Sequence, residues 1–125
     1  MVRIFKCKHC GNLMMVMEKK GCTPVCCGEE MVELIAGTVD AAKEKHIPVI
    51  VVNGKVVEVV VGEVLHPMTE AHLISWIILE TNKGVQVRNL QYTDEPKAIF
   101  ALADGEEVVR AFEYCNLHGL WMKEM

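Results

Sequence analysis

The chain has 125 residues and a formal net charge of −4, with 51% hydrophobic and 24% charged residues. This composition supports one compact domain, or a small module joined to one, and it excludes disorder as the main state. A mildly acidic chain without a basic run is a poor binder of nucleic acids or anionic membranes, and no apolar stretch has the length of a membrane-spanning helix.

Cysteines are concentrated at the start of the chain. Five of the six lie in the first 27 residues, and the sixth is Cys115. Cys7 comes too early for the apolar core of a signal peptide to precede it, so we expect a cytoplasmic protein. In that reducing compartment, clustered cysteines bind a metal more often than they pair as disulfides. Residues 1–36 therefore read as a small metal-bound module. Its predicted strands are Ile4–Cys7, Leu13–Glu18 and Met31–Ala36.

The remaining residues, 37–125, read as a separate β domain. They carry a net charge of −5, whereas residues 1–36 carry +1, which places a boundary near Gly37. Only Val39–Lys45 has a helical pattern. Elsewhere valine-rich runs alternate with turn signals such as Asn53-Gly54, which is typical of a β-sandwich or barrel. The predicted strands are Ile47–Val52, Lys55–Val64, His72–Thr81, Gly84–Tyr92, Lys97–Ala103 and Glu107–Cys115.

Four of the N-terminal cysteines have the spacing of one tetrahedral metal site. A C-x-x-C turn followed by glycine is succeeded, after fifteen residues, by an adjacent cysteine pair and a second glycine. Four thiolates suit zinc and iron alike, so a structural zinc staple and a redox-active iron both remain open. The adjacent pair predicts a distorted tetrahedron. Cys22 and His9 are substitute ligands in principle, but we expect a free thiol and a solvated turn residue. The four predicted ligands are Cys7, Cys10, Cys26 and Cys27.

Four of the five histidines lie in residues 37–125, close to ends of predicted strands, and a cysteine lies three residues before the last of them. Neutral imidazoles and a thiolate are ligands of copper and iron redox centres. One arrangement is a blue-copper carrier with Cys115, His118 and the thioether of Met122. The other is a non-haem iron with five ligands and one open position. A binding module in which the histidines share no site is a third possibility. The five ligands of the iron arrangement are His46, His66, His72, His118 and Cys115.

Taken together, the motifs resemble desulfoferrodoxin, the two-iron form of superoxide reductase. The matching segments occur in family order over nearly the whole chain. They are Cys7–Gly11, Cys26–Glu29, Glu44–Val49, His66–Met68, His72 and Cys115–Gly119. The resemblance implies an all-β chain with two irons: a desulforedoxin-like, rubredoxin-type module at 1–36 and an immunoglobulin-like catalytic sandwich at 37–125. It also implies a homodimer.

The resemblance further implies a reaction and roles for individual residues. Superoxide would be reduced by one electron to hydrogen peroxide, without dismutation to oxygen, at an iron with four histidine ligands and Cys115 as axial thiolate. Lys45 would supply local positive charge for an anionic substrate. Glu44 would occupy the open position in the resting ferric state. Rubredoxin or a similar small carrier is the expected electron donor, and detoxification of superoxide is the expected role.

Overall fold

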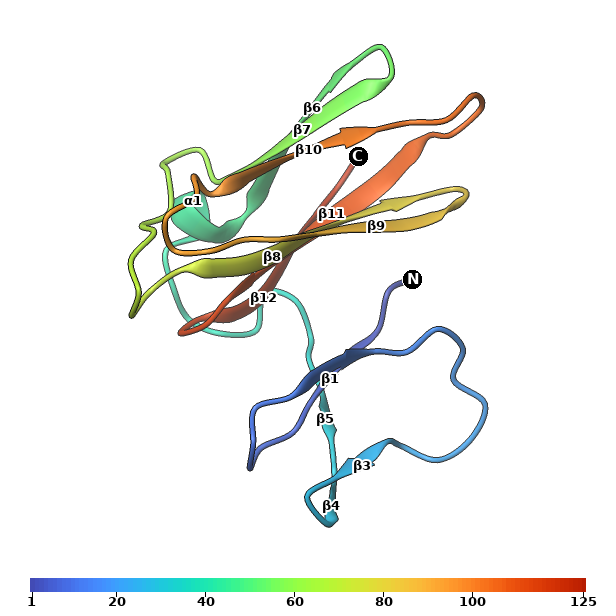
Figure 1. Ribbon diagram of the computed structural model, residues 1–125, viewed down its shortest axis with the longest axis vertical. Helices are drawn as coiled ribbons and strands as arrows, with labels where there is room; N and C mark the ends of the chain where they lie inside the picture. Colours follow the sequence, from blue (N-terminus) through green and yellow to red (C-terminus); the bar gives the residue numbers. More distant parts are fainter. The chain divides into compact units, whose positions relative to one another are not determined.

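A computed structural model describes all residues, 1–125. The chain divides into two compact units, Met1–Ile35 and Ala36–Met125, and each is built from β-strands (Figure 1). The one helix, α1 (Lys43–His46), has four residues. This composition confirms the predicted all-β class. No helix of the structure is long and apolar enough to cross a membrane.

The first unit has little regular structure and a small core. Its strands are β1 (Ile4–Lys6), β2 (Leu13–Met15), β3 (Val25–Cys26), β4 (Glu29–Glu30) and β5 (Val32–Glu33). β1 lies between β2 and β5 in an antiparallel sheet, and β3 pairs with β4 in a separate hairpin. Its core cluster is Phe5, Cys7 and Met31, with Val16 and Cys26 packed against it. A unit with so small a core needs additional stabilisation, such as a bound metal ion or disulfides.

The second unit is a sandwich of two antiparallel sheets (Figure 1). One sheet has the strand order β10-β7-β6 and the other has the order β12-β11-β8-β9. Valines 57, 59 and 61 of β7 and Ile74, Ile77 and Leu79 of β8 belong to one buried cluster, so the core lies between the sheets. Its strands are β6 (Pro48–Asn53), β7 (Val56–Val61), β8 (Ile74–Thr81), β9 (Gly84–Asn89), β10 (Lys97–Ala101), β11 (Val108–Cys115) and β12 (Gly119–Glu124).

Local sequence accounts for much of this sandwich. In β10, Ala98 and Phe100 are buried and their neighbours are exposed, which is the alternation of a half-buried strand. The predicted Asn53-Gly54 hairpin is confirmed, because Asn53 of β6 pairs with Val56 of β7. Gly54 has φ 62°, a backbone region that favours glycine and suits the tight turn between these strands.

The sequence-based prediction that Glu107–Cys115 is the last strand is wrong. β12 follows it after a short turn and pairs with β11 from Cys115 opposite Gly119 to Arg110 opposite Glu124. β12 buries the consecutive residues Leu120 and Trp121, so it lacks the alternation that marks a strand. The valine-rich β7 also ends at Val61, earlier than expected, which leaves residues 62–73 as a long connection to β8.

Candidate metal centres

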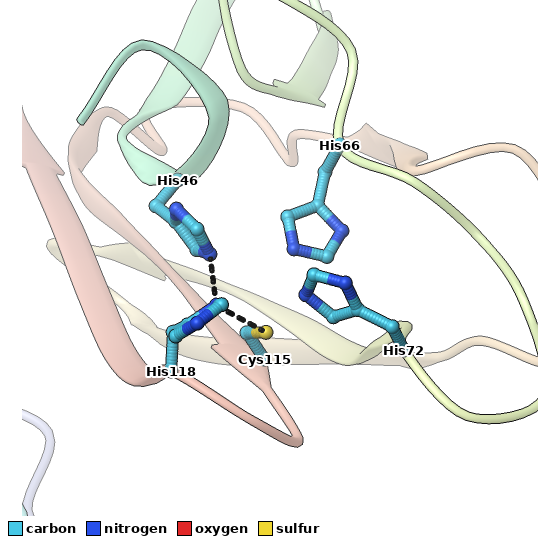
Figure 2. Close-up of side chains that lie close together, drawn as sticks. All are labelled: His46, His66, His72, Cys115 and His118. Atoms are coloured by element: carbon cyan, nitrogen blue, oxygen red, sulfur yellow. Dashed lines mark hydrogen bonds between the residues drawn. The ribbon is translucent and has the colours of Figure 1, made fainter. Parts of the chain in front are cut away.

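Five side chains of the second unit converge at one end of the sandwich. Figure 2 shows four imidazole rings and one thiol directed toward a common centre. One potential ligand atom from each lies within 4.8 Å of the others, so the group could hold a metal ion. The five residues come from α1, the β7–β8 connection, the end of β11 and the β11–β12 turn. They are His46, His66, His72, Cys115 and His118.

The α1 turn is held in place by the start of the β7–β8 connection. The N–H of Val64 donates to the carbonyl oxygen of Glu44 at 2.9 Å. Gly62 lies so close to the turn that a Cβ atom there would be 2.8 Å from the carbonyl oxygens of both Glu44 and Ile47. Glycine is therefore the residue that allows this approach, and the buried His46 ends the turn that it supports.

Hydrogen bonds to backbone carbonyls orient two of the rings. Nδ1 of His46 lies 2.7 Å from the carbonyl oxygen of Ala42, and Nδ1 of His66 lies 2.6 Å from that of Pro67. In this arrangement Nδ1 carries the proton and Nε2 keeps its lone pair. For His118, Nδ1 is the inward atom, because it lies 3.2 Å from Nε2 of His46. The hydrogen bonds to the backbone carbonyls thus select tautomers of His46 and His66 whose unprotonated Nε2 atoms are free to bind a metal.

Two of the inward nitrogens have no hydrogen-bond partner in the protein. Nε2 of His66 and Nε2 of His72 are buried and make no hydrogen bond. Burial of such atoms without a partner costs free energy, so a native site of this kind needs an explanation. A cation bound at the centre supplies it, because neutral imidazole nitrogens and a thiolate are metal ligands.

The protonation states suit metal binding. Burial lowers the pKa of His46 and of His72, and it lowers the pKa of His66 to about 4, so these rings are neutral at pH 7. Burial raises the pKa of the Cys115 thiol. The backbone N–H groups of Leu117 and His118 act in the opposite direction, because they stabilise the thiolate, but burial has the larger effect. A metal that displaces the Cys115 proton therefore meets a site with two N–H donors already directed at the sulfur.

Trp121 contacts two of the five residues and was not singled out by sequence analysis. Its ring stacks on that of His46 with centroids 5.0 Å apart, and its Nε1–H donates to the carbonyl oxygen of His118 at 3.0 Å. The signal for Trp121 was missed because β12 was not predicted. Glu113 was missed as well: it is fully buried two residues before Cys115, and burial raises its pKa to about 9.

The strand register disfavours the blue-copper arrangement. Trp121 of β12 lies opposite Glu113 of β11, and Met122 lies opposite Phe112. Side chains alternate between the two faces of a sheet, so Met122 faces away from the side that carries Glu113 and Cys115. The site also gathers four imidazoles, whereas a blue-copper centre uses two.

Glu44 and Lys45 lie beside this group. Both precede His46 in α1, and both are exposed while His46 is 2% exposed. The short helix therefore presents one acidic and two basic side chains to solvent at the edge of the buried cluster, Glu44 between Lys43 and Lys45. Glu44 and Lys45 are the two residues for which the family resemblance implies a role in substrate chemistry.

The second cluster gathers four thiols in the first unit. Each offers a sulfur within 4.8 Å of the others, and Sγ of Cys10 lies 3.6 Å from Sγ of Cys26. Cys27 has φ 53°, the one non-glycine residue in the left-handed region, at the point where adjacent cysteines must turn toward one centre. Cys22 lies outside the group, and His9 pairs with Glu29 instead. The four residues are Cys7, Cys10, Cys26 and Cys27.

The close contacts among the four thiols shift their pKa values in opposite directions. Backbone N–H groups of Cys10 and His9 lower the pKa of Cys7 to about 6, whereas contacts with the Cys10 and Cys7 sulfurs raise the pKa of Cys27 to about 12. Full ionisation of the group therefore needs a cation to offset the repulsion between thiolates. The first unit also lacks a core large enough to hold it together, which is the role of a structural metal.

Comparison with known proteins gives the family. Residues 38–124 match the family model described as desulfoferrodoxin, and residues 1–34 match the desulfoferrodoxin N-terminal domain. The chain belongs to the desulfoferrodoxin family. A desulfoferrodoxin of Syntrophotalea carbinolica is 46% identical over 123 residues, which cover 98% of this chain and 96% of the relative.

Two solved structures show the same relationship. The superoxide reductase from Treponema pallidum aligns with a TM-score of 0.84 and 41% identity over 99% of both chains. The superoxide reductase (1Fe-SOR) from Giardia intestinalis aligns with a TM-score of 0.58 and 35% identity, covering 66% of this chain and 98% of that one. Membership of the desulfoferrodoxin family settles the metal that spacing left open. The chain has two iron sites, one of four cysteines and one of four histidines and a cysteine, as the resemblance predicted.

Proposed function

We propose that this chain is a superoxide reductase, which reduces superoxide by one electron to hydrogen peroxide without dismutation to oxygen. The observation that carries the proposal is the largely buried group of four imidazoles and one thiol, in which two inward nitrogens make no hydrogen bond. Related chains named superoxide reductase align over most of this chain at 41% and 35% identity. Each superoxide consumed takes up one electron and two protons to form one peroxide.

The proposed ligands are those that the geometry directs inward. Iron held by these five donors would supply a one-electron reductant and would leave room for an anion to bind. The carbonyls of Ala42 and Pro67 hold the Nδ1 protons of His46 and His66, so that each ring presents Nε2. Cys115 would contribute its thiolate, which would donate electron density to the iron as thiolate ligands do in haem enzymes. The full proposed set is His46, His66, His72, His118 and Cys115.

Lys45 and Glu44 are the proposed residues that meet the substrate. The chain as a whole carries a net charge of −4, so attraction of an anion requires local positive charge. Lys45 supplies it from the exposed side of α1, next to His46. Glu44, its neighbour, would be the exchangeable carboxylate that closes the open position in the resting state. Water supplies the protons.

The two units have separate proposed roles. Residues 1–36 form a desulforedoxin-like module whose four cysteines hold an iron, and residues 37–125 form the catalytic domain. The small core of the first unit supports a stabilising role for its metal. Rubredoxin or a similar small carrier as electron donor, a homodimer and a cytoplasmic location stay predictions, and so does detoxification of superoxide as the role in the cell.

The stoichiometry of the reaction tests the proposal. Iron-loaded full-length protein, an excess of a reduced one-electron carrier and a measured flux of superoxide are combined, and hydrogen peroxide and oxygen are both measured. A reductase yields one peroxide for each superoxide and no oxygen. A dismutase yields one peroxide for every two superoxide ions together with oxygen, and that result would refute the proposed function.

A further inference from the structure

Asn116 joins two segments that each carry residues of the histidine and cysteine site. It lies in the β11–β12 turn, between Cys115 and His118. Its backbone N–H donates to the carbonyl oxygen of Leu73 at 3.2 Å, and its Oδ1 accepts from the N–H of Leu73 at 3.0 Å. Its Nδ2 donates to the carbonyl oxygen of Ala71 at 2.9 Å. These three bonds reach the residues on both sides of His72.

The loop that carries His72 is otherwise closed mainly on itself. The N–H of Thr69 donates to the carbonyl oxygen of His72, and the N–H of His72 donates back to that of Thr69. The hydroxyl of Thr69 joins the same small turn. These bonds set the shape of the loop but do not attach it to the sandwich. On the other side of the loop, Met68 packs against the core and its sulfur accepts from the N–H of Ile74 at 3.3 Å. Asn116 makes the hydrogen bonds that attach the residues flanking His72 to the turn that supplies Cys115 and His118.

We propose that Asn116 is a positioning residue that fastens the His72 loop to the β11–β12 turn and thereby sets how long the site retains its iron. The inference rests on the proposed ligand set. Outer residues that orient ligands typically change metal affinity by about 10–100-fold when they are removed. A functional constellation tolerates displacements of only about 0.5 Å, and Nε2 of His72 makes no hydrogen bond that would orient the ring.

The chain contains a matched control for Asn116. Asn82 is also exposed and also makes two side-chain bonds of the same kind. Its Nδ2 donates to the carbonyl oxygen of Gly105 at 3.1 Å, and its Oδ1 accepts from the N–H of Glu107 at 2.8 Å. It follows the last residue of β8, whereas the His72 loop precedes the first. Asn82→Ala therefore removes an equivalent pair of bonds at the far end of the same strand.

The test measures iron release from the full-length, iron-loaded protein after addition of excess EDTA. Loss of thiolate-to-iron absorption reports the histidine and cysteine site, and the separate absorption of the four-cysteine site is an internal reference. Asn116→Ala is expected to release the iron of the histidine and cysteine site about 10–100-fold faster than wild type. Asn82→Ala is expected to release it at the wild-type rate, although both variants lower the melting temperature. The four-cysteine iron is expected to leave at one rate in all three proteins.

Asn116→Asp refines the test and covers the case in which Asn116→Ala does not fold. Aspartate keeps the acceptor for the Leu73 N–H but loses the donor to Ala71, so an intermediate release rate is expected. Wild-type release from Asn116→Asp, or equal release from Asn116→Ala and Asn82→Ala, would overturn the positioning role. A wild-type chain that holds no iron at this site would instead refute the proposed function on which the inference rests.

Discussion

Replacing Gly62 with alanine tests how tightly the α1 turn is positioned. The added Cβ would lie 2.8 Å from the carbonyl oxygens of Glu44 and Ile47 and 3.2 Å from the carbonyl carbon of Lys45. Close C–H···O contacts in proteins have C···O distances of about 3.3–3.6 Å. The two oxygens are therefore too close by about 0.5 Å, and all three contacts are to backbone atoms that cannot rotate away.

The displacement reaches the metal site whichever segment moves. If the α1 turn shifts, it carries His46 and its neighbours Glu44 and Lys45 with it. If the connection shifts instead, it pulls on His66, whose N–H donates to the carbonyl oxygen of Val61. A shift of about 0.5 Å is at the limit that a functional site tolerates. Overpacking of this kind also destabilises a fold by about 1–3 kcal/mol.

The assay combines iron content, thermal unfolding and the rate of superoxide reduction. Gly62→Ala is expected to lower the affinity for the second-unit iron by about 10–100-fold, with the four-cysteine iron retained. Gly54→Ala is the control, because Gly54 has φ 62° and no neighbouring atom within 4 Å of the added Cβ. It strains the backbone without touching α1. If Gly62→Ala is destabilised no more than Gly54→Ala and keeps its iron and its rate, the close approach does not position the site.

Three further perturbations test other parts of the site and fold. Cys115→Ser is expected to lose the thiolate-to-iron colour and most of the activity, and an unchanged visible spectrum would exclude this residue as a ligand. Lys45→Ala is expected to slow the reaction with superoxide and weaken its dependence on salt while both irons stay bound; identical rates across salt concentrations would contradict this. The hydroxyl of Thr81 donates to Glu106 at 2.6 Å and lowers the pKa of that carboxyl, so its ionised form stabilises the fold above the ordinary pKa. The stability difference between wild type and Glu106→Gln in urea unfolding should therefore shrink as the pH falls through the ordinary pKa toward the lowered one, and a constant difference would contradict this reasoning.

Features with a local cause could be predicted from the sequence, and features that depend on distant packing could not. The Asn53-Gly54 turn determines its own hairpin, because its backbone preference and its flanking valines act within a few residues. β12 was missed because burial of both Leu120 and Trp121 depends on what covers each face of the sheet. The end of β7 at Val61 was also missed, since Val64 has a strand-like side chain but donates its N–H to Glu44 of the α1 turn.

For the metal sites, too, the features with a local cause could be predicted and the features that depend on distant contacts could not. Residue types and spacing indicated a four-sulfur site and a group of histidines with Cys115, but they left zinc, iron and copper open. The family resemblance made that choice. Neither spacing nor resemblance indicated what positions the ligands. The contacts made by Gly62, Asn116 and Trp121 join segments far apart in the chain, and a single sequence shows no sign of such pairs.

The unequal exposure of the thiols bears on how the protein withstands its own product. Cys115 is fully buried in the sandwich core, whereas Cys10 and Cys27 of the four-sulfur site are exposed, and so is the unligated Cys22. Peroxide attacks accessible thiolates first and converts them stepwise to sulfenic and higher acids. Oxidation by peroxide in solution is therefore expected to begin at the exposed thiols of the first unit, before it reaches Cys115.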